Sequence, residues 1–318
     1  MPAAELISPA ADALASAWEE ARQIWLEQQT INTRRAYESS LRMLLEFSSM
    51  EIWQIGRKEV ARWAAQLRKT CADATLAQRL SAVSSFYKFC AEEYTLTAPD
   101  GSEVPLSASN PALGAARPHI DPYNKAAVLD LAAAKAFLAA IPRARAIDLR
   151  DYALFLGFLM TGRRNSEWRN LRYEDIEIRA AGMIFRWSGK GRTNAVQELP
   201  AVVWDAIEHY AELEGRSSGY VFHSYDWHGA IVERPISAGA VRASMKYYAN
   251  KAGLNGDILH VHSLRHTAAL LRKEAGDDLE NIRDFLGHMS LGTTSIYLRQ
   301  LQGRKDDTWQ TVAQMLGL

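Results

Sequence analysis

Cysteine is scarce in this chain of 318 residues: only Cys71 and Cys90 occur, both in segments with helical periodicity. Two cysteines do not make a disulfide framework, which favours a reducing compartment. Apolar runs long enough to span a membrane are absent as well, and the N-terminus lacks a basic stretch ahead of an apolar core. These absences predict a cytoplasmic protein with no membrane partner.

Net charge is absent too, because 37 basic and 37 acidic side chains balance. Residues 1–30 nevertheless hold one basic and five acidic residues, whereas residues 31–90 hold ten basic and five acidic ones. Such segregation can place a basic face on a neutral protein, although ordinary solvated helix surfaces would give the same counts. The charge balance therefore does not exclude a nucleic-acid partner.

Apolar residues at helical spacing predict four amphipathic helices in the first hundred residues, which together close one small bundle. Thr33 is the expected N-cap of the second helix. Residues 97–126 then hold five of the ten prolines and break every periodic pattern, as a linker does. The predicted division is a tail at 1–12, a helical domain at 13–112, a linker at 113–126 and a second domain at 127–318.

The second domain is expected to be mostly helical with one small sheet. A β-hairpin is predicted where "GMIFRW" and "VQELP" flank the turn "SGKGRTNA". Helices are predicted after Asp130, across "RDYALFLGFLMTG", and at 201–214, 237–252, 263–275, 278–286 and 309–316.

Four clusters in this domain carry residues capable of chemistry. "TGRRNSE" holds Arg164 with Glu167 one helical turn on, and the turn "GKG" holds Lys190. "HSLRHTAA" places two histidines four residues apart, and "LGHMSLGTTSIY" ends on a tyrosine. The residues of these last two clusters are His262, Arg265, His266, His288 and Tyr297.

A metal site is the first hypothesis for the pair His262 and His266, because a His-x-x-x-His spacing suits zinc. A zinc hydrolase of that type carries glutamate directly after the first histidine, where this chain has Ser263. Arg265 would also place a fixed positive charge beside the cation. We therefore expect no metal, and a metal-dependent nuclease or hydrolase stays as a disfavoured alternative.

An anion site accounts for more of these residues. Two arginines from separate segments can grip a phosphodiester through bidentate hydrogen bonds and neutralise charge that develops on phosphorus. Tyr297 would then be a nucleophile and Lys190 a proton donor to the leaving oxygen. Singly, each has an ordinary interpretation: Tyr297 as a core residue, Lys190 as a solvated turn residue, and Arg164 as an ion-pair partner of Glu167. Their presence in one domain favours a shared role.

Together the four motifs resemble the tyrosine recombinase, or phage integrase, family, in the family's order and near its spacing. The resemblance covers about residues 125–300, and more weakly 13–112. It implies a mainly α fold with a small β-sheet, made of an N-terminal four-helix, SAM-like core-binding domain and a C-terminal catalytic domain. It also implies a site-specific recombinase that cleaves and rejoins DNA through a 3′-phosphotyrosyl intermediate, without cofactor, metal or ATP.

The same resemblance assigns roles to residues. Arg164 and Arg265 would clamp the scissile phosphate, with His262 and His288 as further hydrogen-bond donors. Lys190 would be the general acid and Tyr297 the nucleophile. Glu167 and His266 would support the site.

The implied partner is double-stranded DNA, which the two domains would hold as a clamp. A homo-tetramer would bring two DNA sites together at the nucleoid, and accessory or directionality proteins could take part. A terminal helix containing Trp309 would dock on its own domain or on a neighbouring protomer. Basic residues expected to contact phosphates are Arg34, Arg35, Arg57, Lys58, Arg79 and Lys88.

Two positions depart from the family pattern. Arg163 stands where an apolar residue is usual, and Ser263 replaces a commoner acidic residue. Two alternatives of the same fold remain: a sequence-specific DNA-binding protein without turnover, and a type IB topoisomerase-like enzyme that relaxes supercoils.

Overall fold

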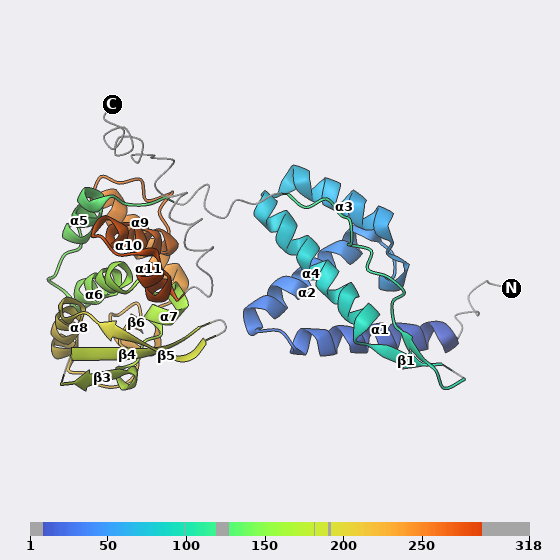
Figure 1. Ribbon diagram of the computed structural model, residues 1–318, viewed down its shortest axis with the longest axis horizontal. Coiled ribbons are helices and arrows are strands. Elements are labelled where there is room, and N and C mark those ends of the chain that lie inside the picture. Colours follow the sequence, from blue (N-terminus) through green and yellow to red (C-terminus); the bar gives the residue numbers. More distant parts are fainter. Residues whose placement is uncertain (1–8, 99, 119–126, 181, 190–191, 288–318) are drawn as a thin grey trace, which may run out of the picture. The chain divides into compact units, whose positions relative to one another are not determined.

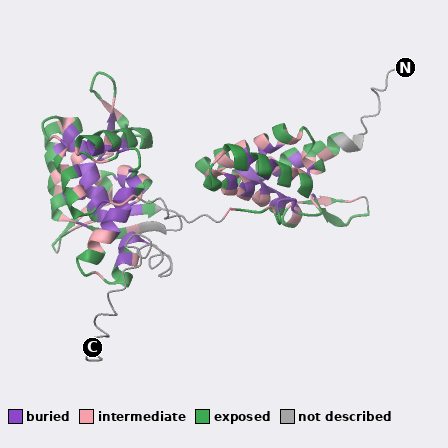
Figure 2. Ribbon diagram, turned by 90° about the horizontal axis from the view of Figure 1, so that it is seen from above, coloured by how far each residue is buried: buried purple, intermediate pink, exposed green. Residues whose placement is uncertain are grey.

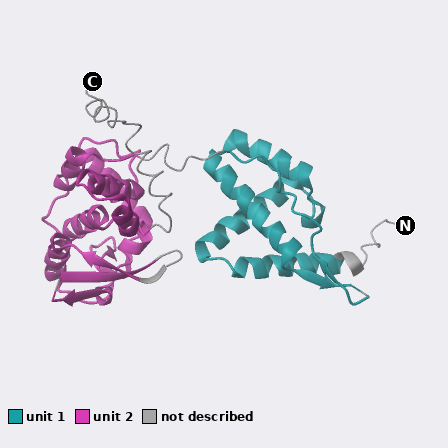
Figure 3. Ribbon diagram, viewed as in Figure 1, with its two compact units in different colours: residues 1–121 teal, residues 122–318 magenta. Residues whose placement is uncertain are grey.

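The computed structural model describes residues 9–98, 100–118, 127–180, 182–189 and 192–287. The chain divides into two compact units, Met1–Asp121 and Pro122–Leu318 (Figure 3). In both units the buried residues gather on the inward sides of the helices, as amphipathic periodicity requires (Figure 2).

The first unit is a helical bundle, in which the four predicted apolar stripes form one core. Trp18 and Trp25 of the first helix pack against Phe86 of the fourth, with ring centroids 5.9 and 5.1 Å apart. Its elements are α1 (Pro9–Glu27), α2 (Ile31–Ser48), the 3-10 helix η1 (Ile52–Gln54), α3 (Arg57–Thr70) and α4 (Asp73–Glu92).

Part of the proline-rich stretch belongs to this unit. Two short antiparallel strands, β1 (Thr95–Thr97) and β2 (Glu103–Pro105), form a hairpin within it. Beyond them the Asn110 amide donates to the Ser84 carbonyl at 2.8 Å. The sequence did not reveal this hairpin, because hydrogen bonds between short strands leave no apolar periodicity.

In its described residues the second unit is mainly helical with two small sheets (Figure 1). Its strands are β3 (Ile176–Arg179), β4 (Gly182–Gly189) and β5 (Arg192–Leu199), paired antiparallel in that order, and a separate hairpin of β6 (His223–Tyr225) and β7 (Ile231–Pro235). Its helices are α5 (Leu131–Ala139), α6 (Ala146–Thr161), α7 (Asn165–Arg169), η2 (Tyr173–Asp175), α8 (Ala201–Glu214), α9 (Ala238–Lys251), α10 (Val261–Glu274) and α11 (Leu279–Leu286).

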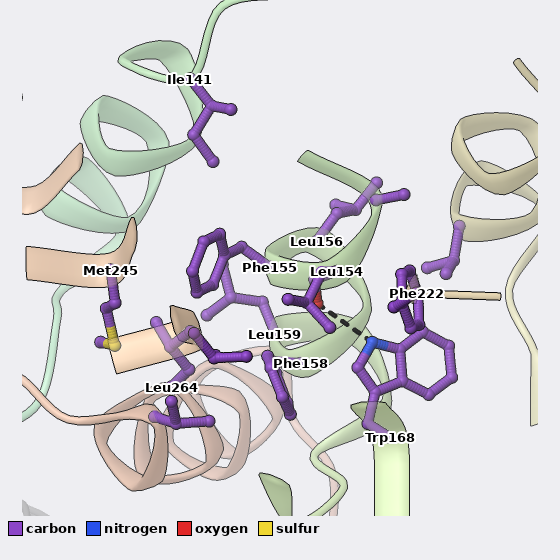
Figure 4. Close-up of a cluster of buried hydrophobic side chains, with 14 of the residues drawn as sticks. Ile141, Leu154, Phe155, Leu156, Phe158, Leu159, Trp168, Phe222, Met245 and Leu264 are labelled. Carbon is purple, nitrogen blue, oxygen red and sulfur yellow. Dashed lines mark hydrogen bonds between the residues drawn. The ribbon is translucent and has the colours of Figure 1, made fainter. Parts of the chain in front are cut away.

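The helix α6 is the centre of this unit. α8 and α10 both pack against it, so it is buried on most sides. Trp168 of α7 packs directly against the α6 backbone, where its Nε1 donates to the Leu154 carbonyl at 3.0 Å (Figure 4). A β-carbon at Gly157 would lie 2.0 Å from the indole ring. Gly157 therefore lets a fully buried tryptophan approach the helix.

The fold class is confirmed, with three corrections. The second helix begins after Thr30, not Thr33, because the Arg34 amide donates to the Thr30 carbonyl at 2.8 Å. α10 begins at Val261 and not near Ser263, whose hydroxyl accepts from the His260 amide at 3.1 Å, as the third residue of a helix does in a capping box. The described residues also hold β3, β6 and β7, which are too short to show a period.

Replacing Gly157 with alanine is expected to lower the free energy of unfolding of the second unit. Overpacking against Trp168 costs about 1–3 kcal/mol, which exceeds the roughly 1 kcal/mol that alanine gains over glycine inside a helix. Gly239→Ala in α9 is the matched control, since its β-carbon would meet nothing closer than 3.8 Å. Denaturant unfolding of the two variants tests this, and equal stability of both would contradict it.

Candidate active site

The turn between α6 and α7 holds the first candidate arginine. α6 is followed by its C-cap residue Gly162, whose φ of 62° lies in the left-handed region that favours glycine. A β-carbon at Gly162 would also lie 2.6 Å from Cε1 of Phe285. This glycine therefore allows both the reversal of the chain and the close approach of α11.

Arg164 is the N-cap residue of α7, and its partner is Glu167 in the first turn. Nη1 of Arg164 donates to Oε1 of Glu167 at 2.9 Å, and its backbone amide donates to Oε2 at 3.0 Å. The glutamate side chain is 2% exposed and that of Arg164 is 38% exposed. A buried carboxylate thus orients a guanidinium that reaches solvent.

The preceding residue, Arg163, is buried, with 1% of its surface exposed. Its Nε donates to the Thr161 carbonyl at 3.3 Å and its Nη2 to the Phe285 carbonyl. Its guanidinium carbon lies 4.2 Å from the ring centroid of Trp187. The two adjacent arginines therefore have different environments, and of the two only Arg164 is partly exposed.

Arg265 on α10 is the second candidate arginine, and it is 2% exposed. Nη1 donates to the Gly162 carbonyl and Nη2 to the Leu286 carbonyl, both at 2.6 Å. Both acceptors lie at the C-terminal ends of helices, where a positive charge is stabilised by the helix dipole. One guanidinium thus joins the ends of α6 and α11 to the start of α10.

His262 reaches solvent one turn before His266, which is buried. Their ring centroids lie 5.0 Å apart at an interplanar angle of 86°, on the shared helix face that their spacing predicted. Loss of hydration within the surrounding protein lowers the pKa of His262, and the charges of Arg265 and Arg164 lower it further, while Glu167 opposes them. His262 is therefore neutral at pH 7 and able to accept a proton.

The hairpin of β4 and β5 is attached to the C-terminal end of α6. Nε2 of Gln197 on β5 donates to the Thr161 carbonyl at 3.1 Å, and the strands pair as far as Gly189 and Arg192. Lys190 follows Gly189 in the sequence and lies outside the described residues, as do His288 and Tyr297. Their roles stay predictions.

Arg163, Trp187 and Gln197 surround this site but were not selected from the sequence. Arg163 was noted only as a departure from a pattern. Trp187 and Gln197 lie on strands and carry no motif, so nothing in the sequence marked them.

The basic residues predicted to contact DNA lie in the first unit. Arg34, Arg35, Arg57, Lys58 and Lys88 are exposed and Arg79 is half-buried. Two of them already have partners: Lys88 lies 3.6 Å from Glu92, and Nε of Arg34 donates to the Leu26 carbonyl at 3.0 Å.

The helix α3 carries a larger basic surface than was predicted. Its one acidic residue, Glu59, is part-buried and accepts a hydrogen bond from the Gly56 amide at 3.1 Å. Helical periodicity would have added its last three basic residues to the predicted set. The exposed basic residues of the α3 face are Arg57, Lys58, Arg62, Arg68 and Lys69.

The described part of the chain holds no group of three or more histidine, cysteine, aspartate or glutamate side chains placed to bind a metal ion. Among the helices described, none combines the length and apolar character needed to cross a membrane.

Family comparisons cover most of both units. The model of the phage integrase family matches residues 127–304, and the N-terminal SAM-like domain of phage integrases matches residues 21–94. The chain is 28% identical over 232 residues to a tyrosine recombinase XerC from Chlamydia muridarum, covering 73% of this chain and 69% of that protein. It is 29% identical over 234 residues to a tyrosine recombinase XerC from Xylella fastidiosa strain M23, covering 74% and 72%.

Solved structures share the fold. A XerH site-specific recombinase bound to a palindromic difH substrate matches with a TM-score of 0.66 and 16% identity, over 92% of this chain and 81% of that one. A lambda integrase dimer bound to a COC′ core site matches with a TM-score of 0.65 and 17% identity, over 92% and 97%. The family match extends over more than half of the sequence, and the chain belongs to the phage integrase family, the tyrosine recombinases.

Proposed function

We propose that this chain is a site-specific recombinase that cleaves and rejoins DNA strands through Tyr297, without metal or ATP. The observation that carries the proposal is the junction of the α6–α7 turn, the start of α10 and the end of α11. Arg164 meets His262 and Arg265 at this junction, although it precedes them by about a hundred residues in the sequence.

The arginines supply the positive charge that phosphoryl transfer requires. Arg265 is fixed by two backbone carbonyls and Arg164 by Glu167, so neither guanidinium has to reorganise much when a phosphodiester binds. Preorganised donors of this kind stabilise charge that develops on phosphorus. A metal ion is not needed for that task.

In the proposed reaction the Tyr297 oxygen attacks phosphorus, and the bond from phosphorus to the 5′ oxygen breaks. Neutral His262 accepts the phenolic proton, and Lys190 donates a proton to the departing 5′ oxygen. The 3′-phosphotyrosyl link retains the bond energy of the phosphodiester, so a 5′ hydroxyl can reverse the step and reseal the strand.

Double-stranded DNA is the proposed substrate, with action in the cytoplasm at the nucleoid. The XerH and lambda integrase structures of this fold are complexes with DNA, which supports the substrate class. The α3 face supplies cations for phosphate contacts. A tetramer on synapsed sites and accessory proteins that set direction belong to the same proposal.

The nucleophile is tested by covalent trapping. Nicked duplexes that carry a site selected for binding should yield a protein–DNA adduct that survives denaturant and forms in the presence of EDTA. Tyr297→Phe removes the attacking oxygen, so adduct formation should drop below detection while DNA binding persists. An adduct from Tyr297→Phe, or one that EDTA abolishes, would overturn the proposal; binding without any adduct would favour the alternative of a silent DNA-binding protein.

The pH dependence tests His262. Its pKa is lowered from 6.5, so the imidazole is neutral at pH 7 and becomes protonated only as the pH falls further. The rate constant for adduct formation should therefore decline below pH 6.5, as the base is lost. His262→Gln does not titrate, so it should be slower at pH 7.5 and lack this decline. An identical acid limb in the variant would assign the titration to another group.

Salt dependence tests the α3 face. Each phosphate contact contributes roughly 0.9 to the slope of log K against log salt concentration. Arg62→Ala and Lys69→Ala should each lower that slope by about one contact and weaken binding equally for all sequences. Arg42→Ala is the control, because Arg42 lies on α2 and is 3.8 Å from Glu46. Slopes equal to wild type in all three variants would remove α3 from the DNA interface.

A further inference from the structure

We propose that Arg163 is a positioning residue for strand cleavage: its buried guanidinium fixes the end of α11, from which the chain continues to His288 and Tyr297. The inference rests on the proposed function and concerns a residue that the resemblance left without a role.

The guanidinium of Arg163 contacts the surrounding elements in several directions. It donates to the Thr161 carbonyl at the end of α6 and to the Phe285 carbonyl in the last turn of α11. Its flat face lies over Trp187 of β4, and Nη1 is 4.0 Å from Oε2 of Glu167. Only a planar group with donors on several edges can make all these contacts at once.

Two buried arginines bind consecutive carbonyls at the end of α11. Arg163 binds the carbonyl of Phe285, and Arg265 binds that of Leu286. Backbone carbonyls in the last turn of a helix lack intrahelical partners, and leaving one unpaired in the interior costs free energy. Under the proposed function Arg265 also binds the phosphate, whereas Arg163 holds the end of α11 in place from within the protein interior.

The end of α11 rests directly on this arginine. Gly287 ends the helix with a φ of 67°. A β-carbon there would lie 3.1 Å from Cη2 of Trp187 and 3.5 Å from Nη1 of Arg163. A shift of the stacked pair therefore shifts the residue from which the chain leads on to His288.

An apolar residue at position 163 would fill volume without donating to Phe285. Lysine would restore one donor and the charge, but not the planar stack on Trp187. We therefore expect the C-terminal end of α11 to become more mobile in Arg163→Met, and to a smaller degree in Arg163→Lys.

Hydrogen exchange measured by mass spectrometry tests the structural half of the inference without DNA. Amides in peptides that cover 283–287 should exchange faster in Arg163→Met and to an intermediate degree in Arg163→Lys. Arg150→Met is the matched control. Arg150 is a buried arginine near the other end of α6, bonded to Asp151 and to the His223 carbonyl. Its loss should leave exchange at 283–287 near that of wild type.

Adduct formation at saturating protein tests the catalytic half. Misplacement of reacting groups by about 1 Å lowers rates by on the order of a hundredfold, so Arg163→Met should slow adduct formation about tenfold to a hundredfold with little change in DNA affinity. Arg163→Lys should recover part of the rate. A 5′-bridging sulfur, a better leaving group, should rescue Lys190→Ala and not Arg163→Met, because the attack itself is impaired.

The outcomes separate the two proposals. Absence of an adduct from wild-type protein overturns the proposed function, whatever the exchange data show. The positioning role is overturned if wild-type protein forms the adduct, but Arg163→Met matches Arg150→Met in hydrogen exchange at 283–287 and in the rate of adduct formation. Rescue of Arg163→Met by sulfur also overturns it, since the defect would then lie in protonation of the leaving oxygen.

Discussion

The two hydrogen bonds from Arg265 to the carbonyls of Gly162 and Leu286 are the constraint on which this site depends. They bring the ends of α6 and α11 to the first turns of α10, so three helix ends meet around one buried cation. The cation is stabilised by helix dipoles, and in turn it satisfies carbonyls that would otherwise lie unpaired. Arg164, His262 and the start of the segment toward His288 are all placed by this junction.

Among the residues that the structure describes, positively charged side chains outnumber negatively charged ones at this junction. Three guanidinium groups, those of Arg163, Arg164 and Arg265, share the region with one buried carboxylate, Glu167. Loss of hydration lowers the pKa of His262, and the charges of Arg265 and Arg164 lower it further. The same field attracts an anionic group, and a phosphodiester that binds between Arg164 and Arg265 would relieve the repulsion between them. Under the proposed function, binding and chemistry would therefore both depend on this one electrostatic arrangement.

Much of the fold followed from periodicity, because apolar stripes such as that through Val60, Trp63 and Leu67 must face a core. Helix boundaries followed less well. The start of α10 depends on the Ser263 hydroxyl in a capping box, a position where an acidic residue is the usual signal. Short strands such as β3 and β6 carry too few residues to show alternation.

Sequence motifs alone identified five residues of the candidate site, and these residues lie close together in the structure. They are Arg164, Glu167, His262, Arg265 and His266. The burial of Arg163 could not be predicted, since its pocket is formed by Trp187 and Phe285, which are distant in the sequence. Lys190, His288 and Tyr297 lie outside the described residues, so their placement rests on the family pattern.

A crystal structure of the protein on a duplex carrying its own site tests the central claim most directly. The account predicts that the guanidinium groups of Arg164 and Arg265 contact one phosphate, with the Tyr297 hydroxyl opposite the 5′ oxygen and Arg163 still bonded to the Phe285 carbonyl. A phosphate held by only one of these two arginines, or a Tyr297 hydroxyl remote from it in every subunit, would contradict the account.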